Sequence, residues 1–252
     1  MEQKSVIVEN ENSTVVSKYQ EDPNQVQFAS EKDLEDALIN KLTLGNLGYE
    51  LVHLKNEQEL EANLRTQLEA LNEDQLKEQP NKKFPEAVWE ELKHILFSVN
   101  NDFKSKTNLL QNSATVSIED KNTGELFNIN LIDKKCLIKN KLQVMHQYTN
   151  SENINNRYDV TILLNGFPIV GIELKRSGVD LRQAFNQIER YQRDSFSASP
   201  LFEFIQLFVI SNGTLTKYYS NTTRDNIAKK NVELNRNPDE LKGSSSYQFA
   251  IT

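Results

Sequence analysis

Two apolar stretches joined by an Asn-Gly pair limit most strongly what this chain can fold into. Residues 158–164 and residues 169–175 have the length and the alternating side chains that are typical of β-strands. Asn165 and Gly166 lie between them, and this dipeptide is typical of the tight turn of a β-hairpin. The sequence therefore predicts an antiparallel strand pair, and the register of that pair decides which side chains share a face.

The length of the connecting loop sets this register. A two-residue loop would place Asp159 opposite Ile172, whereas a three-residue loop that includes Phe167 places Asp159 opposite Glu173. The hydrophobic pattern favours the longer loop, because that register gathers the apolar side chains on one face. The apolar face then carries Tyr158, Val160, Ile162, Leu164, Val170, Ile172 and Leu174. The other face carries a polar cluster around a glycine, which we expect to leave room for a ligand: Asp159, Thr161, Gly171, Glu173 and Lys175.

The polar face has the residue types that metal-dependent hydrolysis of phosphodiesters requires. Two carboxylates with Cβ atoms about 5 Å apart repel each other unless a cation lies between them, and their hard oxygen atoms suit Mg²⁺. A metal held by Asp159 and Glu173 would polarise a phosphodiester and help to generate hydroxide. Lys175 would orient the nucleophile or offset negative charge on the phosphate. These residues predict phosphodiester hydrolysis.

A simpler interpretation of the same residues stays open. Triplets of an acid, any residue and a lysine also occur elsewhere, for example at Glu91 and Lys93 in a helical pattern. The hairpin would then be a surface element with ordinary polar side chains. In that case Glu173 and Lys175 would form a simple salt bridge.

The residues after the hairpin predict a crossover that returns to the sheet. Residues 180–193 have the spacing of an amphipathic helix, and residues 204–211 form a strand that we expect to run parallel to the second hairpin strand. Gln187 and Tyr191 lie one turn apart, where they would bind phosphate or brace Lys175. For Gln187 alone, a solvated helix edge is the stronger interpretation. The outer face of this helix offers candidate DNA contacts at Arg182, Arg190 and Arg193.

Composition excludes several classes of protein. The 252 residues carry 29 Lys and Arg against 36 Asp and Glu, a formal net charge of −7. Any DNA contact must therefore be local or supplied by a partner. The single cysteine, Cys136, rules out an intrachain disulfide, and neither a signal peptide nor an apolar run of the ~20 residues that span a bilayer is present. We therefore expect a cytoplasmic protein with no membrane contact. His53, His94 and His146 lack metal-ligand spacing and are interpreted as structural.

The rest of the chain predicts one large domain after a polar arm. Residues 1–29 form the arm, with one strand near residues 5–8, and residues 30–252 form the domain. A capping-box sequence at Ser30 begins a helix that ends before Gly45. Further helices are predicted over residues 57–71 and 85–97, and further strands over residues 49–54, 115–118, 127–132 and 142–148, with the sheet beginning at Thr115. A β-like stretch at residues 247–251 with no polar tail predicts a fragment of a longer protein.

Residues 157–223 resemble a known family. The stretches 157–168, 172–175, 184–191 and 210–213 are together similar to the N-terminal nuclease domain of the restriction (motor, R) subunit of type I restriction-modification enzymes, a branch of the PD-(D/E)xK nuclease superfamily. Residues 30–54 resemble the opening helix and the Gly-Tyr strand of that family. Residues 55–115 and 225–245 carry little resemblance, and Tyr158 stands where the motif has a proline.

The resemblance implies an α/β fold with a restriction-endonuclease-like mixed central β-sheet flanked by α-helices. It also implies two metal-binding acids, a catalytic lysine and a glutamine-tyrosine motif, which correspond here to Asp159, Glu173, Lys175, Gln187 and Tyr191. Such sites often include an acid from the first helix. Glu35 is our candidate for that acid and Glu31 is the second choice, with a solvated helix face as the alternative for both.

The resemblance implies partners as well. Double-stranded DNA is the expected substrate and Mg²⁺ the expected cofactor. Methyltransferase and specificity subunits and the helicase domains of the same polypeptide are the expected partners. These residues contain no phosphate-binding loop of the Gly-x-x-x-x-Gly-Lys-Ser/Thr type, so ATP would be needed only by the absent motor domains. Two alternatives stay open: a non-catalytic docking or coupling module with the same fold, and a stand-alone repair or recombination nuclease that cleaves without ATP.

Overall fold

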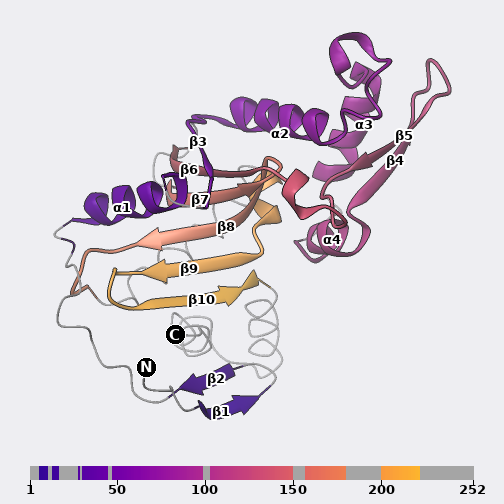
Figure 1. The fold of residues 1–252 in the computed structure, drawn as a ribbon. Coiled ribbons are helices and arrows are strands. Elements are labelled where there is room, and N and C mark those ends of the chain that lie inside the picture. The colour runs from indigo at the N-terminus through magenta and orange to yellow at the C-terminus, as the bar shows by residue number, and fades with distance from the viewer. Residues whose placement is uncertain are drawn as a thin grey trace, which may run out of the picture.

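A six-stranded sheet forms the centre of the computed structural model (Figure 1), which describes residues 6–10, 13–16, 28, 30–44, 47–98, 103–149, 157–179 and 200–221. Its strands lie in the order β10 (Thr216–Ser220), β9 (Leu207–Ser211), β8 (Phe167–Leu174), β7 (Arg157–Leu164), β6 (Leu142–Thr149) and β3 (Glu50–Val52). The pairs β8–β9 and β3–β6 are parallel, and the other neighbours are antiparallel. The sheet is therefore mixed, which confirms the predicted α/β class and the parallel strands of the crossover.

The turn of the β7–β8 hairpin is shorter than predicted. Leu164 pairs with Phe167, so the loop consists of Asn165 and Gly166 alone, with φ angles of 50° and 86°. Gly166 is also required by packing, because a Cβ atom there would lie 2.6 Å from Cα of Leu64. The predicted three-residue loop is therefore wrong.

A β-bulge nevertheless produces the predicted register at the far end of the hairpin. The pairing shifts by one residue next to Ile162, and beyond that point Val160 pairs with Ile172. Continuing this register brings Asp159 level with Glu173. An extra residue inside the strand thus has the same effect on the register as an extra residue in the loop.

Helix α1 (Glu31–Thr43) covers one face of the sheet. It begins with the predicted capping box, in which Ser30 Oγ accepts a hydrogen bond from the Asp33 amide (3.1 Å) and Asp33 Oδ2 accepts one from the Ser30 amide (3.2 Å). The core between helix and sheet contains Leu34, Ile39, Leu42, Val144, Val160, Ile172 and Leu174. This packing confirms the core position of Val160, Ile172 and Leu174 on the predicted apolar face of the hairpin.

A larger core lies on the other side of the sheet. Its helices and turns are α2 (Glu57–Leu71), α3 (Glu86–Phe97), the π-helical turn η2 (Leu109–Ser113) and the 3-10 turn η4 (Pro200–Phe204), and the short helix α4 (Phe103–Asn108) precedes η2. The bounds of α2 match the predicted helix, and α4 was not predicted. Within the part of the chain that is described, no helix combines the length and apolar character that crossing a membrane requires.

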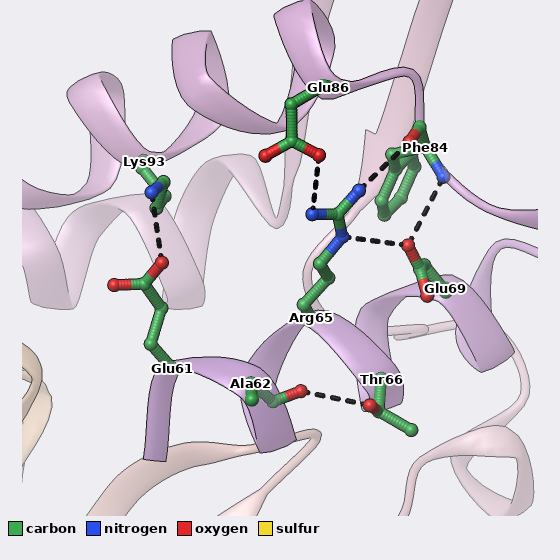
Figure 2. A network of polar contacts seen from close by, with 8 residues as sticks. All are labelled: Glu61, Ala62, Arg65, Thr66, Glu69, Phe84, Glu86 and Lys93. Atoms are coloured by element: carbon green, nitrogen blue, oxygen red, sulfur yellow. Dashed lines mark hydrogen bonds and ion pairs between the residues drawn. The ribbon is translucent and has the colours of Figure 1, made fainter. Parts of the chain in front are cut away.

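Arg65 ties α2 to α3 in this second layer (Figure 2). Its guanidinium donates to Glu69 (3.0 Å), to Glu86 (2.8 Å) and to the carbonyl of Phe84 (3.1 Å). It also lies 5.3 Å from the ring centroid of Trp89. These contacts hold the two helices together above the sheet, where α2 meets the hairpin turn.

The polar face of the hairpin is more enclosed than predicted. A Cβ atom on Gly171 would lie 3.5 Å from side-chain atoms of both Ile205 and Phe208. Thr161 and Glu173 on the same face are buried as well. The room expected around Gly171 for a ligand is therefore filled, because Ile205, which follows η4, and Phe208 on β9 pack against it. Any ligand site must lie further along the sheet, at the end that carries Glu173.

Two hairpins stand apart from the central sheet. The strands β4 (Thr115–Glu119) and β5 (Leu126–Asn130) pair with each other, and Figure 1 shows them extending away from the sheet. The prediction that the central sheet begins at Thr115 is therefore wrong: the apolar side of this hairpin packs against the helices instead. In the predicted arm, β1 (Val6–Asn10) pairs with β2 (Ser13–Val16). The remaining 3-10 turns are η1 (Pro80–Lys82) and η3 (Leu137–Lys139).

Candidate active site

One end of the central sheet brings the predicted acids Asp159 and Glu173 close to His146, which was not predicted for the site. Three neighbouring strands, β8, β7 and β6, carry Glu173, Asp159 and His146 at this end. The strand register places these residues side by side. Asp159 is level with Glu173, and His146 pairs with Val160, the next residue along β7. Lys175 follows directly after β8. Asp159, Glu173 and Lys175 therefore lie close together at this end of the sheet, although Asp159 and Lys175 are 16 positions apart in the sequence.

Asp159 is partly buried near the start of β7. Its Oδ2 atom accepts a hydrogen bond from the Leu174 amide (2.7 Å), which ties it to the end of β8. Burial raises the pKa of Asp159 to about 6, although the Leu174 amide and the Lys175 charge act in the opposite direction. The negative charges of Glu35 and Glu31 add to the increase in pKa. Asp159 thus lies within electrostatic reach of both acids on α1.

Glu173 is fully buried, with 0% of its surface exposed. Its Oε1 atom accepts a hydrogen bond from Lys175 Nζ (3.0 Å), whereas its Oε2 atom has no hydrogen-bond partner. Burial raises the pKa of Glu173 to about 8; the Asp159 charge adds to this effect and Lys175 opposes it. A buried carboxylate oxygen without a donor is costly, so this position favours either a proton or a cation.

Lys175 bridges the sheet and α1. Its Nζ atom lies 3.0 Å from Glu173 Oε1 and 3.5 Å from Glu31 Oε1, and its side chain is 10% exposed. Burial alone would lower the pKa of Lys175, but Glu173, Glu31 and Asp159 together raise it above its ordinary value. Lys175 therefore carries a positive charge that is held among carboxylates at the end of the sheet.

The two candidate acids of α1 have different surroundings. Glu31 is half-exposed and contacts Lys175, whereas Glu35 is only 5% exposed. The Glu35 carboxylate lies 3.3 Å from His146 Nδ1. Glu31 therefore lies beside Lys175 and Glu35 beside His146, and Glu35 does not lie on a solvated helix face.

The remaining predicted residues lie outside the described part of the chain. These are Gln187 and Tyr191 of the glutamine-tyrosine motif and the candidate DNA contacts Arg182, Arg190 and Arg193. The helix predicted over residues 180–193 and the strand predicted over residues 247–251 also lie outside it.

The donor set of Asp159 and Glu173 fits a hard divalent cation. The buried, unpartnered Oε2 atom of Glu173 is a ligand of the required type. The described residues include no group of three His, Cys, Asp or Glu side chains that could hold a metal by themselves. Mg²⁺ does not require one, because it commonly binds through one or two carboxylates and completes its shell with water and phosphate oxygens.

Comparison with known proteins places the chain in a family. Residues 28–227 match the family described as the type I restriction enzyme R protein N terminus. The chain belongs to this family. The match includes both strands of the hairpin, α1 and β6, and so it contains every side chain of the candidate site.

Relatives of this R protein N-terminal domain are named as endonuclease subunits. The type I restriction enzyme EcoprrI endonuclease subunit of Escherichia coli is 41% identical over 221 residues, which cover 86% of this chain and 67% of the relative. The SauCOLORF180P endonuclease subunit of Staphylococcus aureus (strain COL) is 36% identical over 196 residues. That alignment covers 77% of this chain but 20% of the relative, so the chain spans about a fifth of the staphylococcal subunit.

One contact of this R protein N-terminal domain was not predicted from the sequence. His146 was interpreted as structural, and the structure places it 3.3 Å from Glu35, the candidate acid of α1. A signal existed in the strand pattern: Val144 and His146 are two residues apart on β6, and Val144 lies in the core beneath α1. A histidine on the same face of β6 as Val144 points toward α1. The acidic side chains of α1 can then form hydrogen bonds with its ring.

Proposed function

We propose that this domain hydrolyses DNA phosphodiester bonds with Mg²⁺, as the nuclease domain of a type I restriction enzyme R subunit. The observation that carries the proposal is the Glu173 carboxylate, which is buried beside Asp159 and Lys175 with one oxygen unpartnered. A structural salt bridge between Glu173 and Lys175 would need neither a second carboxylate nor a buried oxygen atom without a hydrogen-bond partner. A cation site uses both, because the cation binds to the two carboxylates and to the free oxygen atom.

The side chains divide the work in this proposal. Asp159 and Glu173 hold the cation, and their pKa values, raised by burial, fall when it binds. A bound Mg²⁺ would polarise the scissile phosphate and acidify the attacking water. Lys175 keeps its ammonium group beside Glu173 and offsets negative charge that develops on the phosphate. Glu35 adds a further carboxylate from α1.

The predicted crossover helix extends this proposal beyond the described residues. Gln187 and Tyr191 would contact phosphate or brace Lys175, and Arg182, Arg190 and Arg193 would contact the DNA backbone. We expect milder losses of cleavage from Gln187→Ala and Tyr191→Ala than from changes of the acids, because neither side chain would hold the cation. Equal losses would instead make them members of the core site.

The partners of the domain are part of the proposal. Since the chain spans about a fifth of the staphylococcal endonuclease subunit, we propose that helicase domains of the same polypeptide move the DNA. We also propose that methyltransferase and specificity subunits choose the site. Such a division of labour is compatible with the net charge of −7, because other domains would hold the duplex and the nuclease domain would need only a local grip.

Cleavage by the assembled enzyme tests the proposal. The full R subunit would carry Asp159→Asn or Glu173→Gln, be combined with its partner subunits, and be given supercoiled plasmid, ATP and MgCl₂. Each variant should lose cleavage by about 10²–10³-fold while ATP hydrolysis continues. Glu91→Gln is the matched control, since Glu91 belongs to another acid-x-Lys triplet on α3 with an exposed side chain.

Other outcomes point to the alternatives. Normal cleavage by either acid variant would refute the assigned site. No Mg²⁺ or Mn²⁺ binding, together with normal cleavage after Lys175→Ala, would favour a non-catalytic coupling module. Cleavage by the 252-residue chain alone without ATP would favour a stand-alone nuclease.

A further inference from the structure

His146 and Glu35 form a contact that the proposed chemistry does not yet use. His146 Nδ1 on β6 lies 3.3 Å from Glu35 Oε1 on α1, a separation of 111 positions in sequence. Glu35 is 5% exposed, and its helix neighbours Leu34 and Ile39 are part of the core beneath α1. A carboxylate in such surroundings requires a partner, and the imidazole supplies it.

The contact between His146 and Glu35 lies next to the candidate site. His146 pairs with Val160, so its backbone lies beside the strand that carries Asp159. Glu35 and Glu31 are one helical turn apart, and Glu31 contacts Lys175 at the end of β8. Helix α1 therefore spans the end of the sheet from β8 to β6, with Asp159 on the strand between them. The negative charge of Glu35 helps to raise the pKa of Asp159.

The imidazole ring is itself held in place. The ring of His53, which follows β3, meets the ring of His146 edge-on, with centroids 5.5 Å apart and an angle of 72° between the ring planes. His146 also belongs to a strand paired on both sides, by β7 and by β3. A side chain fixed in this way can orient a partner far better than one on a loop.

We propose that His146 is a positioning residue, which holds the Glu35 carboxylate beside the nuclease site so that Glu35 contributes to cation binding there. This inference rests on the proposed function, because a positioned carboxylate matters only if a cation binds there. Residues that orient metal-binding carboxylates typically change metal affinity by about 10–100-fold when they are replaced.

The competing explanation is a purely structural tie between α1 and β6. Two substitutions of His146 separate the explanations. His146→Asn keeps an N–H donor near the position of Nδ1, whereas His146→Leu fills the space and removes the donor. A structural tie predicts that stability tracks metal affinity in both variants. A positioning role predicts that affinity follows the donor, whatever the change in stability.

Titration of the 252-residue chain with MnCl₂ in a calorimeter is the test, with thermal melting of each variant alongside. We expect His146→Leu to weaken Mn²⁺ binding by about 10-fold or more and His146→Asn to restore most of the affinity. Combined with Glu35→Gln, His146→Leu should cause no further loss, because the two residues act through one interaction. His94→Asn on α3 is the matched control and should bind like the wild type. Should His146→Leu not fold, His146→Gln replaces it, because its amide reaches the position of Nε2 rather than Nδ1.

Failure of this inference is distinguishable from failure of the proposed function. If Asp159→Asn abolishes Mn²⁺ binding while His146→Leu binds like the wild type, the role of His146 is refuted and the proposed function stands. Equal weakening by His146→Asn and His146→Leu, or additive losses with Glu35→Gln, also refutes that role. A wild-type chain that binds neither Mn²⁺ nor Mg²⁺ overturns both.

Discussion

The Nζ atom of Lys175 lies 3.0 Å from Oε1 of Glu173, although the Glu173 side chain is completely buried. A buried ion pair is weak evidence of stabilisation, because the loss of hydration offsets much of the attraction between the charges. Here the second carboxylate oxygen has no hydrogen-bond partner at all. The pair therefore costs stability in the metal-free chain, and several measurable consequences arise from that cost.

The free energy of unfolding of the metal-free chain should fall as the pH rises from about 4.5 to about 8. Burial raises the pKa of Glu173 from 4.5 to about 8, so in this window the folded chain holds a proton that the unfolded chain has released. Protonation then favours the folded state, and stability is lost as the proton leaves. Glu173→Gln should match the wild type near the acid end and exceed it above pH 8 by on the order of 2 kcal/mol.

Urea unfolding at both ends of this pH window measures the effect. The control is Glu91→Gln, whose exposed carboxylate should give no gain that depends on pH. A Glu173→Gln variant that is less stable than the wild type above pH 8 would contradict the assignment of the buried proton.

Binding of a divalent cation should release protons near neutral pH. Burial raises the pKa of Asp159 to about 6 and that of Glu173 to about 8, whereas a metal ligand must be ionised. The affinity for Mn²⁺ should therefore increase between pH 6 and pH 8. Calorimetry in two buffers with different ionisation enthalpies counts the released protons. Identical heats of binding in both buffers would show that no proton is displaced.

Gly166→Ala should destabilise the chain by about 2–4 kcal/mol. The residue has a φ angle of 86°, and an added Cβ atom would lie 2.6 Å from the Cα atom of Leu64, a backbone atom that cannot move aside cheaply. Gly124→Ala is the matched control, because Gly124 has a φ angle of 73° but nothing within 4 Å of the added atom. The control should lose about 1–2 kcal/mol, the cost of the left-handed backbone alone. Equal losses of stability in Gly166→Ala and Gly124→Ala would mean that the hairpin turn does not pack closely against α2.

Strong local patterns made much of the fold predictable. The leucines of α2 at positions 60, 64 and 68 form one stripe that ends in the core, and the predicted bounds of that helix match. The capping box at Ser30 identified the start of α1 in the same way. Asp159, Glu173 and Lys175 became candidates because they share one polar face of the predicted hairpin, and the structure brings them together at one end of the sheet.

The features that were missed depend on distant parts of the chain. A bulge next to Ile162 and a longer loop shift the register equally, so the hydrophobic pattern could not distinguish them. The filling of the space at Gly171 depends on Ile205 and Phe208, which no local pattern places there. The contact of His146 with Glu35 joins a strand to a helix 111 positions away, and no spacing rule covers such a pair.

Lys175→Ala in the assembled enzyme tests the central claim most directly. Removing the ammonium group should leave the proposed motor domains untouched, because the 252 residues contain no Gly-x-x-x-x-Gly-Lys-Ser/Thr loop. Nicked and linear plasmid products should be measured beside ATP turnover in the same reaction. We predict that cleavage is lost while ATP turnover stays at the wild-type rate. Normal cleavage by Lys175→Ala would contradict it.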